Sequence, residues 1–372
     1  MRLLIDARKA FDSGIGTYIR SVMPRVVERL PGVPVAAVVE AGTAARHGWL
    51  PARCTVVEVD APPLGLHEQA ALRRAIGPDD LFWATSLAHP LFTRAPLVAT
   101  VHDVAQLAVA PQRAGDWLVR QAARLYFRSL RSTARLLLFN SAFTRAEFAR
   151  DVGTPPASAR VTPLGVDPAW FDGPAEPPAD GVPRLVCIGN WRPHKNLGLL
   201  LRAFEAVAPQ LPHRLQLVGK ADGYRDPEPA VRACLERLGG RVEFTGFLPD
   251  EALRRQVAAA DALVVPSLYE GFGLPPLEAM AAGVPVLAAR AAALPEVCGD
   301  CADYFDPRAP ESLQALLLAH AARTAAERAE RRARGRERAR QFSWDRTADA
   351  TVEALQDALR APAARPRASA AR

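Results

Sequence analysis

Residues 266–285, PSLYEGFGLPPLEAMAAGVP, carry the strongest chemical pattern in the sequence. Gly271 and Gly273 permit a tight loop with exposed backbone N–H groups, and the two prolines that follow suit the start of a helix. Such a loop favours anionic oxygens through its free N–H groups and the helix dipole. Glu270 precedes the loop and Glu278 is expected in the first helical turn, where carboxylates could accept hydrogen bonds from paired hydroxyls. The segment predicts a ligand with phosphate and sugar groups, although either glutamate alone could be a solvated or helix-stabilising residue.

Two cations follow another apolar run, Leu185–Ile188. Arg192 offers a planar fork and Lys195 a compact charge, which together fit a diphosphate. Lys195 is also one of only three lysines among 47 basic residues. Asn196 is the expected N-cap of the next helix. The alternative is a pair of surface cations, although positive charge is slightly unfavourable at a helix start.

Three weaker patterns remain. His102 ends the apolar run Leu97–Val101, and the neighbouring Asp103 is expected to orient the loop rather than to react. Gly14-x-Gly16 lacks the third glycine of a dinucleotide fingerprint, so by itself it predicts a turn. The Cys298-x-x-Cys301 pair has neither a second cysteine pair nor a nearby histidine, and we assign it no metal or redox role.

These residues must be positioned by elements that alternate between short apolar runs and helical patterns, which predicts parallel sheets covered by helices on both faces. The expected strands are Leu3–Ile5, Val35–Val39, Thr55–Val59, Leu81–Ala84, Leu97–Val101, Leu136–Phe139, Leu185–Ile188, Arg214–Val218, Val242–Phe244, Ala262–Val265 and Val284–Ala288. The Pro- and Gly-rich segment 172–183 predicts a linker between doubly wound halves at 1–171 and 184–344. In such sheets, ligands bind outside the carboxyl ends of the strands.

The composition agrees with a two-domain globular protein. The chain has 372 residues, of which 49% are hydrophobic and 23% charged, with a net charge of +7. This balance excludes overall disorder, and five cysteines are too few for a disulfide scaffold. No apolar segment is long enough to span a membrane, so we expect a cytoplasmic location. The Arg-rich segment 323–340 lacks interleaved aromatics, which argues against nucleic-acid binding, and residues 361–372 resemble a disordered tail.

A predicted helix at 116–135 carries arginines at helical spacing. One face holds Arg120, Arg124, Arg128, Arg131 and Arg135, and the predicted opposite side holds Leu118, Ala122 and Leu125. The simple interpretation is the solvated face of a packed helix. The alternative is salt-sensitive contact with anionic lipid head groups, worth about 1 kcal/mol per basic residue. That contact would place the protein at the inner face of the cytoplasmic membrane.

The segment EGFGLPPLEAMAAGVPV, with Glu270-x7-Glu278, resembles the signature of glycosyltransferase family 4, the retaining nucleotide-sugar enzymes of GT-B fold. Other segments resemble the family in order along the chain: Gly14–Tyr18, Thr100–Asp103, Asn140–Thr144, Pro163–Asp167, Gly189–Asn196 and Phe244–Phe247. The resemblance implies two doubly wound Rossmann-like domains facing a cleft. It also implies that a C-terminal helix at about 345–360 crosses back to the first domain, and that domain closure aligns the substrates.

The resemblance further implies specific roles. The catalytic residues would be His102 beside the transferred sugar, Arg192 and Lys195 on the donor diphosphate, and Glu270 on the sugar hydroxyls. Donor binding would involve Gly14, Gly16, Asn190, Gly246, Phe247, Gly271, Phe272, Gly273, Leu274 and Glu278, the last on the ribose. We expect no metal or other cofactor, because cations and backbone amides can stabilise the departing diphosphate.

The whole pattern most resembles bacterial mannosyltransferases of polysaccharide or O-antigen assembly. The first expectation for the donor is GDP-mannose, with a saccharide or lipid-linked saccharide as acceptor. A UDP-hexose or a GDP-deoxyhexose is the alternative donor. Two other classes stay open: a GT-B sugar-nucleotide epimerase, which typically lacks the paired glutamates, and a non-catalytic protein that binds nucleotide sugars.

Overall fold

The computed structural model describes residues 1–61, 65–91, 93, 95–109, 116–172, 180–219 and 229–360. The chain divides into two compact units, one of Met1–Gly165 with the segment from Trp344 onward, and one of Val166–Ser343. The boundary therefore falls earlier than the predicted end of the first domain at residue 171. Most of the predicted linker, residues 173–179, and the predicted tail at 361–372 lie outside the described residues.

Unit 1 is built on a seven-stranded parallel sheet with the order β3-β2-β1-β4-β5-β6-β7. Its strands are β1 (Arg2–Asp6), β2 (Val35–Glu40), β3 (Thr55–Val59), β4 (Asp80–Ala84), β5 (Leu97–Val101), β6 (Ala134–Phe139) and β7 (Arg160–Val161). The central strands β4 and β5 are buried along their whole length, as expected for a sheet covered on both faces. All but β7 match the predicted strands; β7 has only two residues, too few to show a pattern.

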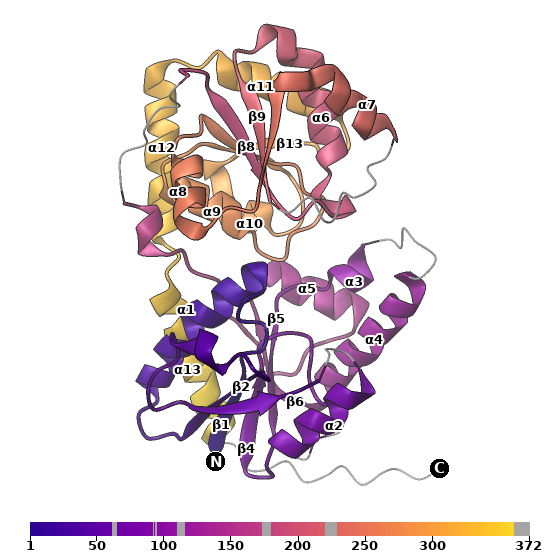
Figure 1. The fold of residues 1–372 in the computed structure, drawn as a ribbon, viewed down its shortest axis with the longest axis vertical. Coiled ribbons are helices and arrows are strands. Elements are labelled where there is room, and N and C mark those ends of the chain that lie inside the picture. Colours follow the sequence, from indigo (N-terminus) through magenta and orange to yellow (C-terminus); the bar gives the residue numbers. More distant parts are fainter. Residues whose placement is uncertain are drawn as a thin grey trace. The chain divides into compact units, whose positions relative to one another are not determined.

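Helices cover both faces of this sheet (Figure 1). They are α1 (Ser13–Arg29), α2 (Leu66–Ala75), α3 (Ala105–Ala108), α4 (Asp116–Thr133), α5 (Ala142–Asp151) and α13 (Trp344–Arg360). Helices α1 and α13 lie together on one side, where Arg29 pairs with Asp345 at 2.7 Å and with Asp349 at 2.6 Å. The C-terminal helix thus belongs to the first unit, as the resemblance implied.

Helix α4 ends before the last of the five predicted arginines. Arg135 lies on β6, where its Nη1 donates to the carbonyl oxygen of Ala358 at 2.7 Å. The prediction of five arginines on one helical face is therefore wrong, because the chain turns into the sheet after Thr133. Arg120, Arg124, Arg128 and Arg131 remain on the helix.

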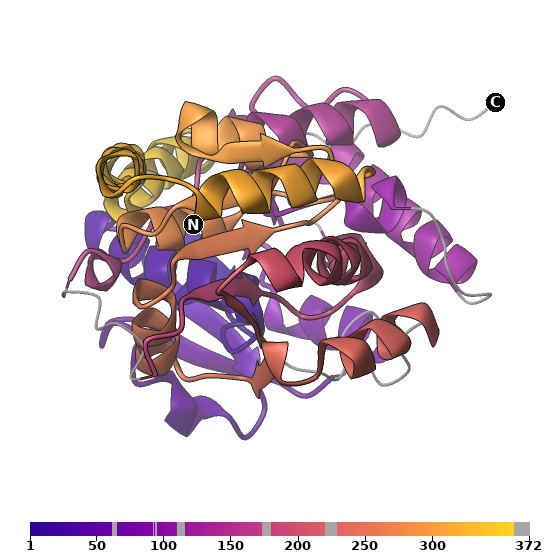
Figure 2. The same ribbon diagram turned by 90° about the horizontal axis from the view of Figure 1, so that it is seen from above.

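Unit 2 contains a six-stranded parallel sheet with the order β10-β9-β8-β11-β12-β13. Its strands are β8 (Arg184–Ile188), β9 (Arg214–Val218), β10 (Val242–Gly246), β11 (Ala262–Val265), β12 (Val286–Ala289) and β13 (Asp303–Phe305). Its α-helices are α6 (Leu197–Val207), α7 (Pro229–Leu238), α8 (Asp250–Ala258), α9 (Leu274–Ala281), α10 (Leu294–Cys298), α11 (Pro310–Ala321) and α12 (Ala325–Arg340). Figure 2 shows helices on both sides of this sheet. The predicted strands are confirmed with small shifts, and β13 was not predicted.

The Arg-rich segment folds as α12, which begins with a capping box between Thr324 and Glu327. Its arginines pair with carboxylates of the same unit, including Arg328 with Asp261 and Arg331 with Asp303. These charges therefore hold the helix on the second sheet. Among the helices that the structure describes, none combines the length and the apolar composition that a bilayer crossing requires.

Candidate active site

The central feature of unit 2 is an ion pair at the carboxyl edge of its sheet. Lys195 lies in a short 3-10 turn after β8 and Glu270 lies after β11, the neighbouring strand at which the strand order reverses. Lys195 Nζ donates to Glu270 Oε1 at 2.7 Å, and both side chains are about one-sixth exposed. The N–H of Leu268 donates to the carbonyl of His194 at 2.8 Å, which joins the two loops. The sequence nominated both residues separately but did not predict that they pair.

Arg192 and Asn190 lie on the same loop as Lys195, and both are exposed to solvent. An exposed guanidinium three residues before Lys195 in the chain offers a second cation for a polyanion. Asn196 does not cap α6 with its side chain, which corrects the prediction. Instead its Nδ2 donates to the carbonyls of Pro266 at 3.2 Å and Pro307 at 2.9 Å, which ties the loop to the ends of β11 and β13.

Three glycines end the neighbouring strands β8, β9 and β10. A side chain at Gly219 would place its Cβ only 1.8 Å from the carbonyl oxygen of Gly189, and its φ of +140° already favours glycine. The Gly219 N–H donates to the Gly246 carbonyl at 2.9 Å. The carboxyl ends of β8, β9 and β10 therefore contact one another through backbone atoms alone. The sequence analysis named Gly246 but missed Gly219, although a glycine directly after an apolar strand was an available signal.

The glycine loop leads into α9 as predicted. Gly273, with a φ of +108°, precedes the helix, and Pro275 and Pro276 occupy its first turn. Because prolines lack an N–H, Pro275 and Pro276 contribute no backbone donor at the start of this helix. Phe272 is only 4% exposed and its ring packs edge-on against Phe342, so its side chain faces the interior. Its contribution to a ligand would come from its backbone.

Glu278 lies one turn further along α9 than expected, because it is the fifth residue of the helix rather than part of the first turn. Burial raises the pKa of its carboxyl group to about 7, and the nearby carboxylates of Asp250 and Asp167 act in the same direction. The group is therefore close to half protonated at neutral pH. Hydroxyl groups that donate to it would favour its charged form.

In unit 1, His102 follows β5 directly. Its Nε2 must carry a proton, because it lies 2.9 Å from the carbonyl oxygen of Thr85, which can only accept. The ring packs edge-on against Tyr18 at 4.8 Å. Burial lowers the pKa of His102 despite the hydrogen bond to Thr85 and the charge of Asp103, so the ring is neutral at pH 7. Its Nδ1 is then left as a hydrogen-bond acceptor.

A small cavity of about 50 Å³ adjoins His102 and is also lined by Ile15, Asp103 and Gln106. Asp103 Oδ1 accepts from the N–H of Ala105 at 2.9 Å, which is the loop-orienting role expected for it. Gly14 and Gly16 lie within the first helical turn of α1. The prediction that Gly14-x-Gly16 forms a non-helical turn is therefore wrong. A Cβ on Gly16 would lie 2.6 Å from the carbonyl of Ala10, so the loop after β1 crosses the helix closely.

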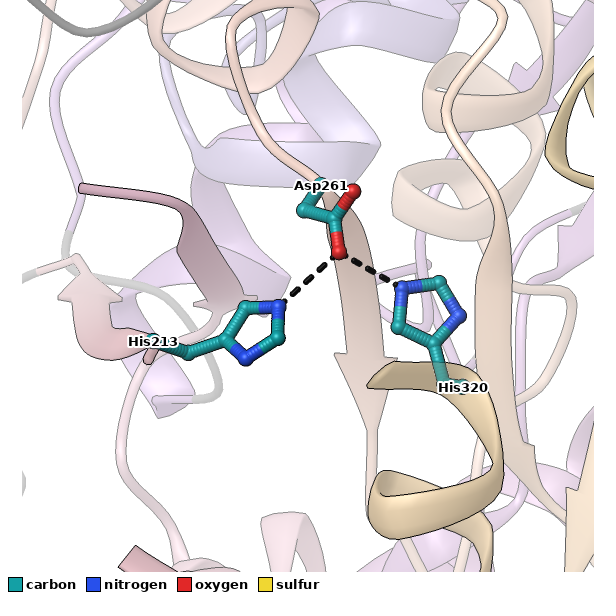
Figure 3. Close-up of side chains that lie close together, drawn as sticks. All are labelled: His213, Asp261 and His320. Carbon is teal, nitrogen blue, oxygen red and sulfur yellow. Dashed lines mark hydrogen bonds and ion pairs between the residues drawn. The ribbon is translucent and has the colours of Figure 1, made fainter. Parts of the chain in front are cut away.

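A second cluster lies at the opposite edge of the sheet in unit 2, before the strands begin. Figure 3 shows His213 and His320 converging on Asp261, whose Oδ2 accepts from the Nε2 of each at 2.9 Å. These residue types could bind a metal, but Arg328 Nη1 also donates to both carboxylate oxygens at 2.7 and 2.8 Å. The guanidinium already occupies the carboxylate, so we interpret the cluster as a structural junction. The sequence carried no signal for it, since its members are far apart.

Comparisons with known proteins agree with this architecture. Residues 182–322 match the family described as glycosyl transferases group 1, and residues 50–170 match glycosyltransferase family 4. The chain is 34% identical to the O-antigen chain mannosyltransferase B of Escherichia coli over 59% of its length and 60% of the relative. It is 33% identical to an MMP alpha-(1->4)-mannosyltransferase of Mycolicibacterium hassiacum over 60% of its length and 56% of the relative. The matches thus span less than two-thirds of these relatives.

Solved structures share the fold over nearly the whole chain. Anabaena HepE in complex with UDP superposes with a TM-score of 0.75 at 20% identity, covering 96% of this chain and all of that one. The sucrose-phosphate synthase of Thermosynechococcus elongatus gives 0.75 at 19% identity, covering 96% and 99%. The chain therefore carries a glycosyltransferase family 4 segment followed by a group 1 glycosyl transferase segment, and it has the GT-B fold.

Proposed function

We propose that the protein is a retaining mannosyltransferase that transfers mannose from GDP-mannose to a saccharide or lipid-linked saccharide acceptor in polysaccharide or O-antigen assembly. The observation that carries the proposal is the Lys195–Glu270 ion pair, with Arg192 and the amides of residues 271–274 on the same edge. A diphosphate needs cations and N–H donors, whereas a sugar needs a carboxylate that can accept from its hydroxyls. All of these groups are assembled within unit 2.

In the proposed reaction, the bond between the anomeric carbon and the diphosphate oxygen breaks, and the diphosphate leaves with the electron pair. Arg192, Lys195 and the loop amides stabilise the negative charge that develops on it. The acceptor hydroxyl attacks the same face of the sugar, and its proton passes to the departing phosphate. Glu270 holds donor-sugar hydroxyls, a role we favour over covalent attack. The Nδ1 of neutral His102 accepts from a hydroxyl of the transferred sugar.

The ion pair adds a step to this account. Lys195 and Glu270 neutralise each other before the donor arrives, so neither charge is left unpaired in a partly buried position. A donor would replace this contact with a phosphate on Lys195 and hydroxyls on Glu270. The proposed chemistry needs no metal ion, because these fixed cations and amides supply the charge stabilisation.

The choice of mannose rests on the names of two sequence relatives, both of which are mannosyltransferases. The structural neighbour bound to UDP is only 20% identical and supports the fold alone. A UDP-hexose or a GDP-deoxyhexose is the alternative donor. The paired glutamates favour transfer over epimerisation, and the assembled ion pair favours catalysis over mere binding.

The test measures GDP release from GDP-mannose, with UDP-hexoses and a GDP-deoxyhexose in parallel, with and without acceptor and in the presence of EDTA. The acceptor is an undecaprenyl-linked saccharide extract from an O-antigen producer. We expect acceptor-dependent, EDTA-resistant release, falling at least about 100-fold in Arg192→Ala and in Lys195→Met. Arg237→Ala, which removes an exposed arginine on α7 of the same unit, is the matched control. Near-normal turnover in both cation variants would contradict the diphosphate assignment, and acceptor-independent turnover would favour an epimerase.

A location at the inner face of the cytoplasmic membrane completes the proposal. It draws on Arg120, Arg124, Arg128 and Arg131 of α4, without Arg135, which lies on β6. A lipid-linked acceptor would itself be presented at such a surface.

A further inference from the structure

His102 is held by hydrogen bonds at its Nε2 and at its backbone, but neither bond by itself fixes the plane of its ring. Nε2 donates to the carbonyl oxygen of Thr85 at 2.9 Å, which sets the tautomer. Asn140 Nδ2 donates to the main-chain carbonyl of His102 at 2.7 Å, which holds the backbone. Rotation of an imidazole about its Cβ–Cγ bond is soft. The orientation of Nδ1 therefore depends on what packs against the ring.

Tyr18 of α1 packs against that ring. The two ring centroids are 4.8 Å apart and the ring planes meet at 78°, an edge-on arrangement in which the positive edge of one ring meets the negative face of the other. The contact is directional, because rotating either ring out of this arrangement weakens the electrostatic attraction. The Tyr18 side chain is itself only 1% exposed. The imidazole of His102 therefore cannot turn freely without displacing a buried tyrosine.

The hydroxyl group of Tyr18 holds the tyrosine in place. It lies 3.2 Å from Thr100 Oγ1, and Trp83 Nε1 donates to the same oxygen at 3.0 Å. Thr100 lies on β5 two residues before His102, so the two side chains leave the chain on the same face. Burial raises the pKa of Tyr18 against the effect of the Thr100 hydrogen bond, so the phenol stays neutral. Tyr18 thus contacts the strand through its hydroxyl and the histidine through its ring.

Packing alone does not explain a tyrosine at this position. A phenylalanine would fill almost the same volume, and Thr100 would still accept from the Trp83 indole. The phenol adds a hydrogen bond that sets where its ring lies along β5. In the segment Gly14–Tyr18, the sequence analysis gave roles to the two glycines and none to the tyrosine.

We propose that Tyr18 is a positioning residue, whose ring holds the imidazole of His102 in the orientation that presents Nδ1 to a hydroxyl of the transferred sugar. The inference rests on the proposed function, because the hydrogen bond between Nδ1 and the sugar is part of it. The effect of Tyr18 passes through His102, and the proposed diphosphate ligands belong to unit 2. Loss of the Tyr18 ring should therefore slow the transfer of a donor that still binds.

The first test is a double-mutant cycle on GDP release by the full chain from GDP-mannose with acceptor. Tyr18→Leu should lower kcat about tenfold, the scale of one aromatic pair, and leave the KM for donor within about twofold of the wild type. Tyr18→Phe loses only one hydrogen bond and should keep kcat within about threefold of the wild type. In the His102→Ala background, Tyr18→Leu should cause no further loss.

The matched control is Tyr126→Leu. Tyr126 is a buried tyrosine of the same unit that also packs edge-on against a histidine, His89, at 5.3 Å and accepts a hydrogen bond from Gln69 at 3.2 Å. This variant should retain kcat, because His89 has no part in the proposed reaction. If Tyr18→Leu fails to fold, Tyr18→Met takes its place, since methionine fills irregular space without a ring.

Nitrogen NMR of the His102 ring supplies a readout that does not depend on turnover. The signals are identified by their loss in His102→Ala, and in the wild type they should report one neutral ring with its proton on Nε2. In Tyr18→Leu they should shift and broaden, because the ring samples further orientations. Tyr18→Phe and Tyr126→Leu should leave them close to the wild type.

Three results would overturn the proposal: losses in kcat that multiply in the double variant, His102 ring signals that are unchanged in Tyr18→Leu, or equal losses in Tyr18→Phe and Tyr18→Leu. Normal turnover in His102→Ala would instead refute the part that His102 has in the proposed function. The nitrogen signals would then still decide whether Tyr18 holds the ring.

Discussion

Glu278 ties donor binding to pH in a way that can be measured. Its pKa is raised to about 7 in the free protein by burial and by Asp250 and Asp167. If the ribose hydroxyls donate hydrogen bonds to Glu278, the nucleotide sugar binds only the ionised carboxylate. Below the pKa, the Glu278 carboxyl group must therefore lose its proton before the nucleotide sugar can bind. At pH 6 only about one-tenth of the carboxyl groups are ionised, so the dissociation constant for donor should rise about tenfold between pH 8 and pH 6.

The assay is calorimetric titration with intact GDP-mannose, whose diphosphate does not titrate in this range. Glu278→Gln should bind more weakly at pH 8 and lose the pH dependence, whereas Glu251→Gln, at an exposed glutamate of α8, should keep both properties. Donor affinity that is constant between pH 6 and 8, or a slope that survives in Glu278→Gln, would refute the assignment of Glu278 to the ribose.

The same substitution has a consequence for stability. A carboxyl whose folded pKa is raised destabilises the folded state above its unfolded pKa, because charging it inside the protein is unfavourable. Glu278→Gln should therefore raise the free energy of unfolding at pH 8, by up to about 3 kcal/mol. Lower stability in this variant would mean that the carboxylate is satisfied in the folded protein, which contradicts the raised pKa.

Two further predictions concern stability. Gly219→Ala forces a Cβ against the Gly189 carbonyl, which should lower the free energy of unfolding by about 3 kcal/mol and abolish donor binding. Gly240→Ala is the control and should have a mild effect, because nothing lies within 4 Å of its Cβ. Equal thermal melts of the two variants would contradict the close backbone approach at Gly219. Asp261→Asn should cost about 3 kcal/mol at pH 7 by leaving Arg328 without its carboxylate. Hydrogen bonds from His213 and His320 hold the pKa of Asp261 well below its usual value against the effect of burial, so its contribution is present above about pH 4 and is lost in acid. Chemical denaturation of the wild type and of Asp261→Asn, measured from neutral to acidic pH, should show their free energies of unfolding converging in acid.

Much of the fold was predictable from the sequence, because the strands of a parallel sheet are buried on both faces and appear as short apolar runs. The runs at β1 and β8 are examples, and both are central strands. Two of the four edge strands escape this logic. β7 and β13 each have only two or three residues, and pairing with a neighbour defines them more than their own composition does.

The site residues were found by type and spacing, but their contacts were not. Lys195 and Glu270 lie 75 positions apart, and only the sheet order brings their loops together. Asn196 has the residue type of an N-cap, yet its side chain binds carbonyls from two other loops. On α4, the helical spacing of the arginines was predicted correctly only as far as Arg131, and spacing alone could not tell which face would meet the core.

The central claim is that unit 2 activates a guanosine-linked mannosyl donor for transfer with retention. The most direct measurement is proton NMR of the glycoside formed from GDP-mannose and acceptor, which reports the anomeric configuration of the new linkage. The account predicts an α-linked mannosyl product, which retains the configuration of the donor, with release of one GDP per linkage. A β-linked product, or a donor other than a mannosyl nucleotide as the preferred substrate, would contradict it.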